Sequence, residues 1–303
     1  MYNIELGKSG LTVPTVAVGC MRISDMSEKE VSAFIDTALE NGANFFDHAD
    51  IYGGGKSETV FGAAITPSLR ENIIIQTKCG IRQGRFDFSY EHITESVNGS
   101  LKRLGTEYID VLLLHRPDAL VEPEEVAKAF DELKASGKVR HFGVSNHNPY
   151  QIQLLQSCLD MPLCVNQLQF SIMHTPMIQS GLNVNMYNDS ATNRDGGVLD
   201  YCRLNKITVQ PWSPVQYGFF EGCFINNKKF PELNMKLKEI GDKYGVSETT
   251  VSFAWILRHP AKMQPVTGTT NLTRLTDCIK ASEIRLSREE WYEIYRAAGN
   301  ILP

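Results

Sequence analysis

The chain has 303 residues, of which 42% are hydrophobic and 21% charged, a composition typical of a globular protein with a large buried core. Its net charge of −5 is spread along the sequence without a long basic run, so nothing indicates nucleic-acid binding. No apolar stretch approaches the roughly 18 residues of a membrane-spanning helix, and residues 1–8 lack the features of a signal peptide. The seven cysteines include no Cys-x-x-Cys pair. We therefore expect a cytoplasmic protein with reduced thiols.

Short apolar runs alternate with amphipathic helices along the whole chain. The first strand is predicted at 16–19. Ser27 and Glu30 then form a capping box that begins a helix, and Gly42 ends that helix. Further strands are predicted at 44–47, 72–76, 111–114, 139–144, 164–169, 207–211 and 264–266.

Helical patterns separate these strands. Two of them end at Gly105 and Gly137. A second capping box, from Ser287 to Glu290, begins the last helix, and weaker helical patterns lie near 149–157, 195–204, 230–244 and 271–282. Segments 171–194 and 216–229 break the rhythm, so we interpret them as long loops of the kind that usually serve a function.

The alternation of about eight strands with helices predicts a parallel sheet. A closed (β/α)8 barrel and a doubly wound open sheet both produce this pattern, and the length favours the barrel. Since no change in composition divides the sequence, we expect a single domain over residues 1–303.

Four chemically active side chains lie at or just beyond the ends of predicted strands: Asp47, Tyr52, Lys78 and His115. Each alone has an ordinary structural explanation, as a turn cap, a loop tyrosine, a solvated lysine or a core histidine. In a parallel barrel, however, these strand ends share one face, which is where barrel enzymes keep their active sites.

Together the four side chains form a proton-transfer set. A tyrosine has a pKa of about 10, which a neighbouring ammonium group lowers. A carboxylate beside Lys78 would hold the ammonium in place, and a histidine can donate a hydrogen bond to a carbonyl oxygen.

With these residues and several further segments, the sequence resembles the aldo-keto reductase family over nearly its whole length. Six motifs of the family occur in order: the strand-Asp and Tyr-Gly pattern, the strand-end lysine, the His-Arg-Pro-Asp segment, the Gly-Lys-x-Arg-x-x-Gly-Val-Ser-Asn run, the Asn-Gln pair and the aromatic-Ser-Pro segment. They match Gly42–Gly53, Lys78, His115–Asp118, Gly137–Asn146, Asn166-Gln167 and Trp212–Pro214. The resemblance implies a TIM barrel that transfers a hydride between NADP(H) and a small carbonyl or alcohol.

The resemblance also implies a role for each catalytic candidate. Tyr52 would be the general acid in carbonyl reduction and the general base in alcohol oxidation. Lys78 and Asp47 would tune Tyr52, and His115 would orient the substrate carbonyl. No metal would be needed.

The cofactor contacts follow from the same resemblance. Ser145, Asn146 and Gln167 would hold the nicotinamide carboxamide, and Trp212, followed by Ser213, would stack on the ring. Segment 216–229 would fold over the cofactor, and its three phenylalanines would either cap the site or pack among themselves: Phe219, Phe220 and Phe224.

The far end of the cofactor would lie where the last predicted strand leads into a helix, since a helix N-terminus and hydroxyl groups favour an anion. Arg274 is a suitable partner for a 2′-phosphate, which favours NADP(H) over NAD(H). The family's usual lysine is replaced here by Gly268, and Asp277-Cys278 replaces its Glu-Asn pair. The expected contacts are Gly268, Thr269, Thr270 and Arg274.

Other classes of function fit the sequence less well. The segment 50–57 resembles a P-loop but begins with Asp50 instead of glycine, and no Gly-x-Gly-x-x-Gly follows a strand. A metal-dependent hydrolase could use Asp47, His48, Asp50 and His115, but Tyr52 would then be idle. Because some family members are accessory subunits of ion channels, a nucleotide-binding subunit with low turnover is the second hypothesis. The substrate and the oligomeric state stay open.

Overall fold

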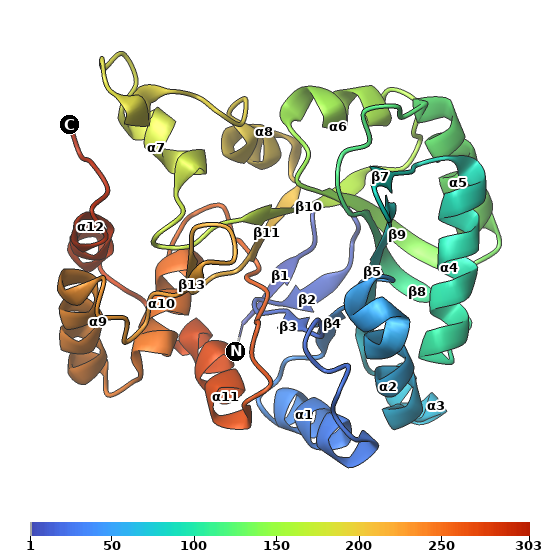
Figure 1. The fold of residues 1–303 in the computed structure, drawn as a ribbon, viewed down its shortest axis with the longest axis horizontal. Helices are drawn as coiled ribbons and strands as arrows, with labels where there is room; N and C mark the ends of the chain where they lie inside the picture. The colour runs from blue at the N-terminus through green and yellow to red at the C-terminus, as the bar shows by residue number, and fades with distance from the viewer. Residues whose placement is uncertain (1) are drawn as a thin grey trace.

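A computed structural model describes residues 2–303. Its centre is a curled parallel sheet with the strand order β11-β10-β9-β8-β5-β4-β3 (Figure 1). The strands are β3 (Val18–Gly19), β4 (Phe45–Asp47), β5 (Ile74–Cys79), β8 (Ile109–Leu114), β9 (Val139–Ser145), β10 (Leu163–Gln169) and β11 (Thr208–Trp212). Six of the seven are buried along most or all of their length, as expected of strands covered on both faces.

An eighth extended segment closes the sheet into a barrel. Val266 bridges Ala17 in parallel, its backbone N–H donates to Pro211 O, and Thr267 N–H donates to Ala17 O. Residues 264–267 thus lie between β11 and the start of β3. The (β/α)8 barrel is therefore confirmed, and the strand expected at 264–266 is its closing segment.

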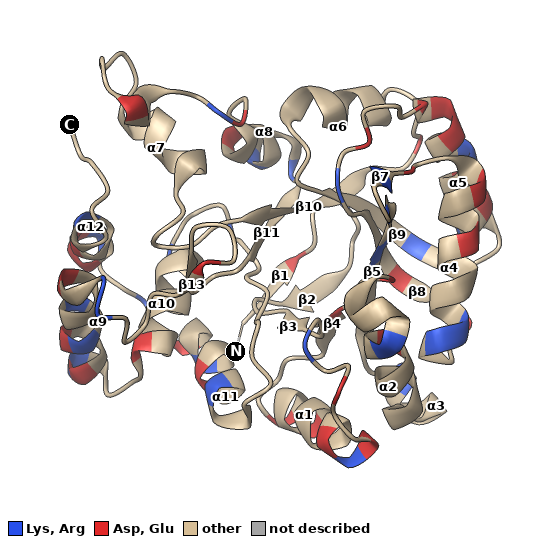
Figure 2. Cartoon of the chain, in the orientation of Figure 1, with Lys and Arg blue, Asp and Glu red and all other residues tan. Residues whose placement is uncertain are grey.

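Helices surround the barrel, with charged residues of both signs mainly on their outer faces (Figures 1 and 2). They are α1 (Glu28–Glu40), α2 (Lys56–Ala64), α3 (Pro67–Arg70), α4 (Tyr90–Leu104), α5 (Pro123–Ala135), α6 (Pro149–Gln156), α7 (Pro176–Leu182), α8 (Val198–Asn205), α9 (Pro231–Tyr244), α10 (Glu248–Leu257), α11 (Leu272–Lys280) and α12 (Arg288–Ala297). Among residues 2–303, no helix is long and apolar enough to cross a membrane.

A hairpin of β1 (Asn3–Glu5) and β2 (Thr12–Pro14) precedes the barrel. Its Ile4 and Val13 join a buried cluster with barrel residues such as Phe45. This packing covers one end of the barrel and leaves the opposite end for a site.

Both capping boxes are present, at Ser27 with Glu30 and at Ser287 with Glu290. The two segments interpreted as loops contain structure that the sequence analysis did not predict. Segment 171–194 includes α7, and segment 216–229 includes a hairpin of β12 (Gln216–Tyr217) and β13 (Gly222–Cys223).

Candidate active site

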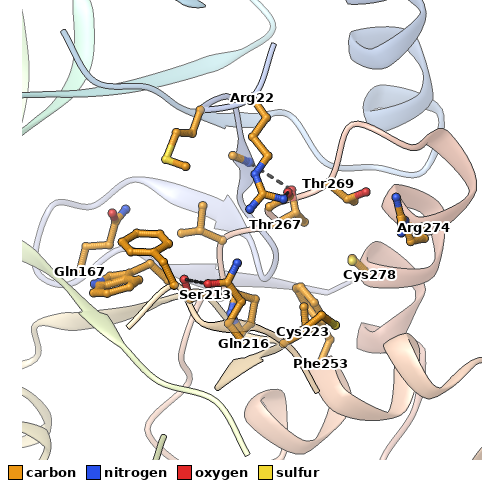
Figure 3. Close-up of a pocket in the computed structure, with 18 of the residues that line it drawn as sticks. Arg22, Gln167, Ser213, Gln216, Cys223, Phe253, Thr267, Thr269, Arg274 and Cys278 are labelled. Carbon is orange, nitrogen blue, oxygen red and sulfur yellow. Dashed lines mark hydrogen bonds between the residues drawn. The ribbon is translucent and has the colours of Figure 1, made fainter. Parts of the chain in front are cut away.

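A cavity of about 850 Å³ opens at the carboxyl ends of the barrel strands. Most of the residues predicted for the site line it: Tyr52, His115, Ser145, Asn146, Gln167, Trp212, Ser213, Gly268, Thr269 and Arg274. Figure 3 shows Gln167 and Arg274 at opposite sides of this cavity. Asp47 and Lys78 lie behind Tyr52 and do not line it, and Thr270 also lies outside the lining.

Asp47, Tyr52 and Lys78 meet at one end of the cavity. Lys78 Nζ donates to Asp47 Oδ2 at 2.8 Å and to Tyr52 Oη at 3.0 Å. It also donates to the carbonyl oxygen of His48 at 2.6 Å, so three oxygen atoms surround the ammonium group. The Lys78 side chain is fully buried, and that of Asp47 is only 4% exposed. The convergence of these groups from β4, β5 and the loop after β4 therefore matches the expectation.

The turn after Tyr52 depends on three glycines. Gly53, Gly54 and Gly55 all have positive φ angles, of 58°, 65° and 92°. A Cβ atom at Gly55 would lie 2.9 Å from Arg103 Cδ. The glycine run thus lets the backbone turn sharply from Tyr52 into α2 against α4.

Burial changes the expected electrostatics of the tyrosine. It raises the pKa of Tyr52 above 10.0, and the Lys78 ammonium offsets only part of that increase. The lowering expected from Lys78 is therefore present, but the opposite effect of burial is larger. Burial also opposes the charge on Lys78, but Asp47 and Tyr52 outweigh it and raise the lysine pKa above 10.5. At neutral pH the phenol is protonated and the lysine is charged.

His115 lies beside Tyr52, with 6.0 Å between the ring centroids in an edge-to-face arrangement. Burial, Lys78 and Arg116 lower the pKa of His115 well below 6.5. Its buried Nδ1 has no hydrogen-bond partner among residues 2–303. The imidazole is therefore neutral at physiological pH, and it carries a single N–H.

A second polar cluster lies further along the rim of the barrel. Asn146 has a φ angle of 62°, which asparagine tolerates better than most residues. Its Nδ2 donates to Ser145 Oγ at 2.8 Å, and its Oδ1 accepts from Trp212 Nε1 at 3.1 Å. Ser145 Oγ in turn donates to the carbonyl oxygen of Gln167 at 2.9 Å. All four predicted residues are thus brought together.

The aromatic residues of segment 216–229 divide into two groups. Phe220 stacks on Trp212 at a centroid distance of 5.8 Å, and Phe219 contacts the same ring edge-on at 6.2 Å. Phe224 is fully buried in the hydrophobic core. Only the first two are therefore placed to cap the cavity.

The far end of the cavity is built from the loop before α11. Gly268, Thr269 and Arg274 line it, and Asn271 caps the helix by accepting from Arg274 N–H at 3.0 Å. Arg274 is exposed. Thr270 is part of the same loop without lining the cavity.

Two arginines that the sequence analysis did not single out also line the cavity. Arg22 Nη1 donates to Gly268 O at 3.0 Å. Arg116 lies with its guanidinium carbon 5.7 Å from the centroid of the Trp212 ring. Arg22 lies three residues after the end of β3 and Arg116 two residues after the end of β8, so a search of the strand ends, which identified His115, could also have identified them. With Arg274 they give the lining three positive charges, against the single carboxylate of Glu248.

An acidic pair lies behind the loop that carries Tyr52. Glu58 is fully buried and accepts from Thr77 Oγ1 at 2.6 Å and from Arg103 Nε at 2.8 Å. Burial and the nearby Glu58 raise the pKa of Asp50 to about 7, although Arg103 lowers it in part. Asp50 Oδ1 is buried without a partner among the described residues.

This pKa predicts a pH-dependent stability. Because the folded state binds the Asp50 proton more tightly than the unfolded state does, stability attributable to Asp50 is lost as pH rises from about 4 to about 7. We expect Asp50→Asn to raise the melting temperature at about pH 8 by about 2–4 °C and to change it little at about pH 4. Thermal unfolding at both pH values measures the difference. If Asp50→Asn instead had a lower melting temperature than the native protein at about pH 8, the fold would be shown to stabilise the Asp50 carboxylate.

Comparison with known proteins agrees with this fold. The family model described as "Aldo/keto reductase family" matches residues 15–298. The chain is 37% identical to 6-dehydroglucose reductase of Agrobacterium fabrum and 34% identical to oxidoreductase YdhF of Escherichia coli, each over 98% of both chains. The crystal structure of thermostable aldo-keto reductase Tm1743 with the inhibitor epalrestat superposes with a TM-score of 0.79 at 26% identity, covering 98% of this chain and 100% of that one.

The chain therefore belongs to the aldo/keto reductase family. This membership supports an oxidoreductase activity on carbonyl compounds.

Proposed function

We propose that this protein is an NADP(H)-dependent reductase of small aldehydes or ketones, with Tyr52 as the general acid. The observation that carries the proposal is the chain of contacts from Asp47 through Lys78 to the Tyr52 hydroxyl at the end of the cavity. The same set can run in reverse and oxidise an alcohol, with Tyr52 as the base.

The residues of the cavity suit a pyridine dinucleotide. Arg22 and Arg274 provide positive charge for its phosphates at one end, and Ser145, Asn146 and Gln167 provide hydrogen-bonding groups for a carboxamide at the opposite end. Trp212 offers an aromatic surface between them. Bound here, the reduced cofactor would supply the hydride that a carbonyl carbon accepts.

The roles of the protein groups follow from their protonation. Tyr52 holds a proton at neutral pH and can donate it to the carbonyl oxygen as negative charge develops there. The charged Lys78 stabilises the phenolate that results, and Asp47 holds Lys78 in position. His115, neutral and beside Tyr52, has one N–H available to orient the same oxygen when its Nε2 carries the proton.

The reaction class is tested by a substrate panel of short aldehydes, ketones, dicarbonyls and sugars, with loss of reduced-nicotinamide absorbance followed separately for NADPH and NADH. We expect turnover with at least one class of carbonyl. Tight dinucleotide binding with negligible turnover throughout would instead favour an accessory subunit.

We propose that the 2′-phosphate of NADP(H) lies near Arg274, because Arg274 is in the first turn of α11 at the end of the cavity away from Tyr52. Replacing Arg274 with alanine is expected to weaken NADPH binding about 10- to 100-fold and to change NADH binding by less than about threefold. Equilibrium titration with the two cofactors measures both constants. Equal weakening of the two would place the 2′-phosphate elsewhere, and Arg288→Met, an exposed arginine at the start of α12, is the control.

A further inference from the structure

Inside the barrel, below the cavity, four buried glutamines form a continuous hydrogen-bonded chain. Three of them come from adjacent segments of the barrel: Gln167 from β10, Gln210 from β11 and Gln264 from the closing segment. The fourth, Gln76, reaches them across the barrel interior from β5. Three of them are completely buried and Gln167 is 3% exposed. We call these residues the glutamine ladder.

The ladder joins two groups that can only accept hydrogen bonds. At one end, the amide nitrogens of Gln76 and Gln167 donate to Asp47 Oδ1 at 2.6 and 3.2 Å. At the other end, Gln264 Nε2 donates to the carbonyl oxygen of Pro14 at 2.6 Å. Neither end offers a proton, so all the donors must come from the ladder itself.

These ends determine which way each amide points. Since Gln264 uses its nitrogen on Pro14, its oxygen faces inward and accepts from Gln210 Nε2 at 2.8 Å. Gln210 must then present its own oxygen to the other side, where it accepts from Gln76 at 2.8 Å and from Gln167 at 3.1 Å. If the Gln210 amide were rotated by half a turn, its NH₂ group would face the NH₂ groups of Gln76 and Gln167, so three donors would face one another.

The arrangement commits both protons of the Gln167 amide to the interior, one to Asp47 and one to Gln210. Gln167 also lines the cavity, so its free group there is the oxygen atom. The ladder thus presents a hydrogen-bond acceptor to a ligand, and not a donor. The cost is visible at Gln76, whose buried oxygen has no partner among residues 2–303.

We propose that Gln210 is a positioning residue that acts through Gln167 and Gln76. It fixes Gln167 Oε1 as the acceptor for the N–H of the nicotinamide carboxamide, and it keeps two amide donors on the carboxylate that holds Lys78. Asp47 and the cofactor site are thereby set by one buried network. This inference rests on the proposed function, because it requires a pyridine dinucleotide in the cavity.

The test compares the binding of NADP⁺ with that of its 3-acetylpyridine analogue, in which a methyl ketone replaces the carboxamide and removes the N–H. Equilibrium dissociation constants are measured by quenching of protein fluorescence, so catalysis is not needed. We expect the native protein to prefer NADP⁺ about three- to tenfold, the effect of one neutral hydrogen bond. In Gln210→Met the oxygen that orients Gln167 is absent, and the preference should fall below about twofold.

Two further variants separate orientation from general damage. Gln210→Glu keeps an oxygen facing Gln76 and Gln167, and the O–H of its buried, protonated carboxyl group can replace the donor to Gln264 Oε1, so it should retain the preference. Thr208→Val lies on the same strand and removes a partly buried hydrogen bond, from Gly7 N–H to Thr208 Oγ1, without touching the ladder. It should lower the melting temperature and leave the preference as in the native protein.

The outcomes distinguish the ladder from the proposed function. A native protein that binds neither dinucleotide would end the proposed function. Two other results would overturn only the role of Gln210, provided that the native protein prefers NADP⁺. One is a folded Gln210→Met that keeps the native preference. The other is a Gln210→Glu that loses as much of the preference as Gln210→Met does. If Gln210→Met does not fold, hydrogen exchange of side-chain amides in the native protein decides the question, because both Gln167 protons should be protected and rapid exchange would contradict the ladder.

Discussion

Replacing Tyr52 with phenylalanine is expected to lower the turnover of carbonyl reduction by about 10²–10⁴-fold, the usual contribution of general acid catalysis. The substitution removes one oxygen atom and leaves the ring. Lys78 keeps its contacts with Asp47 and with the His48 carbonyl, so the fold of the site should persist. None of the hydrogen bonds and charge contacts proposed for the cofactor uses the Tyr52 hydroxyl, so NADPH affinity should change by less than about threefold.

Steady-state rates with the best carbonyl of the panel, together with NADPH titration, measure both quantities. The pH dependence provides a further check. Because burial raises the pKa of Tyr52 above 10.0, reduction by the native protein should not decline through tyrosine ionisation below about pH 9. A Tyr52→Phe variant with near-native rates would show that another group delivers the proton.

The second large effect is expected for Lys78→Met, which breaks the buried ion pair with Asp47. The pair is 2.8 Å long with side chains 0% and 4% exposed, so the remaining carboxylate cannot regain water. Removing one partner of such a pair typically costs about 3–5 kcal/mol, although the amide donors of Gln76 and Gln167 reduce the loss here. Turnover should also fall at least as far as in Tyr52→Phe, because the phenolate loses its neighbouring charge.

Urea unfolding without cofactor measures the free energy of unfolding of this variant. The matched control is Lys56→Met, since Lys56 pairs with Asp25 at 3.5 Å while both side chains are 67% or more exposed. That pair should contribute less than about 1 kcal/mol. Equal effects of the two substitutions would contradict the account of a buried, interdependent site.

The strand-helix rhythm predicted a parallel sheet covered by helices, because apolar periodicity reports which face of an element is buried. The chain length favoured a barrel over an open sheet, and the family resemblance implied it. Helix α10 was not predicted, because it lacks this apolar periodicity. Its residues from Thr250 to Leu257 are all buried, so the helix carries no polar face and no helical period. Residues 264–266 were predicted as a strand, and they form the closing segment through hydrogen bonds to both neighbours.

The candidate catalytic residues were predictable because strand ends in a parallel barrel share a face. What the sequence could not show was the balance of burial and charge at Tyr52, which depends on how far the surrounding atoms exclude water. The ladder was equally hidden. Gln76 and Gln210 lie in the interior of apolar strands, and only the register of the barrel brings their amides together.

A crystal structure of the native protein with NADP⁺ tests the central claim most directly. The account predicts the nicotinamide ring beside Tyr52 and His115, its carboxamide nitrogen on Gln167 Oε1, and the 2′-phosphate near Arg274. A dinucleotide bound in the reverse direction, or outside this cavity, would contradict it.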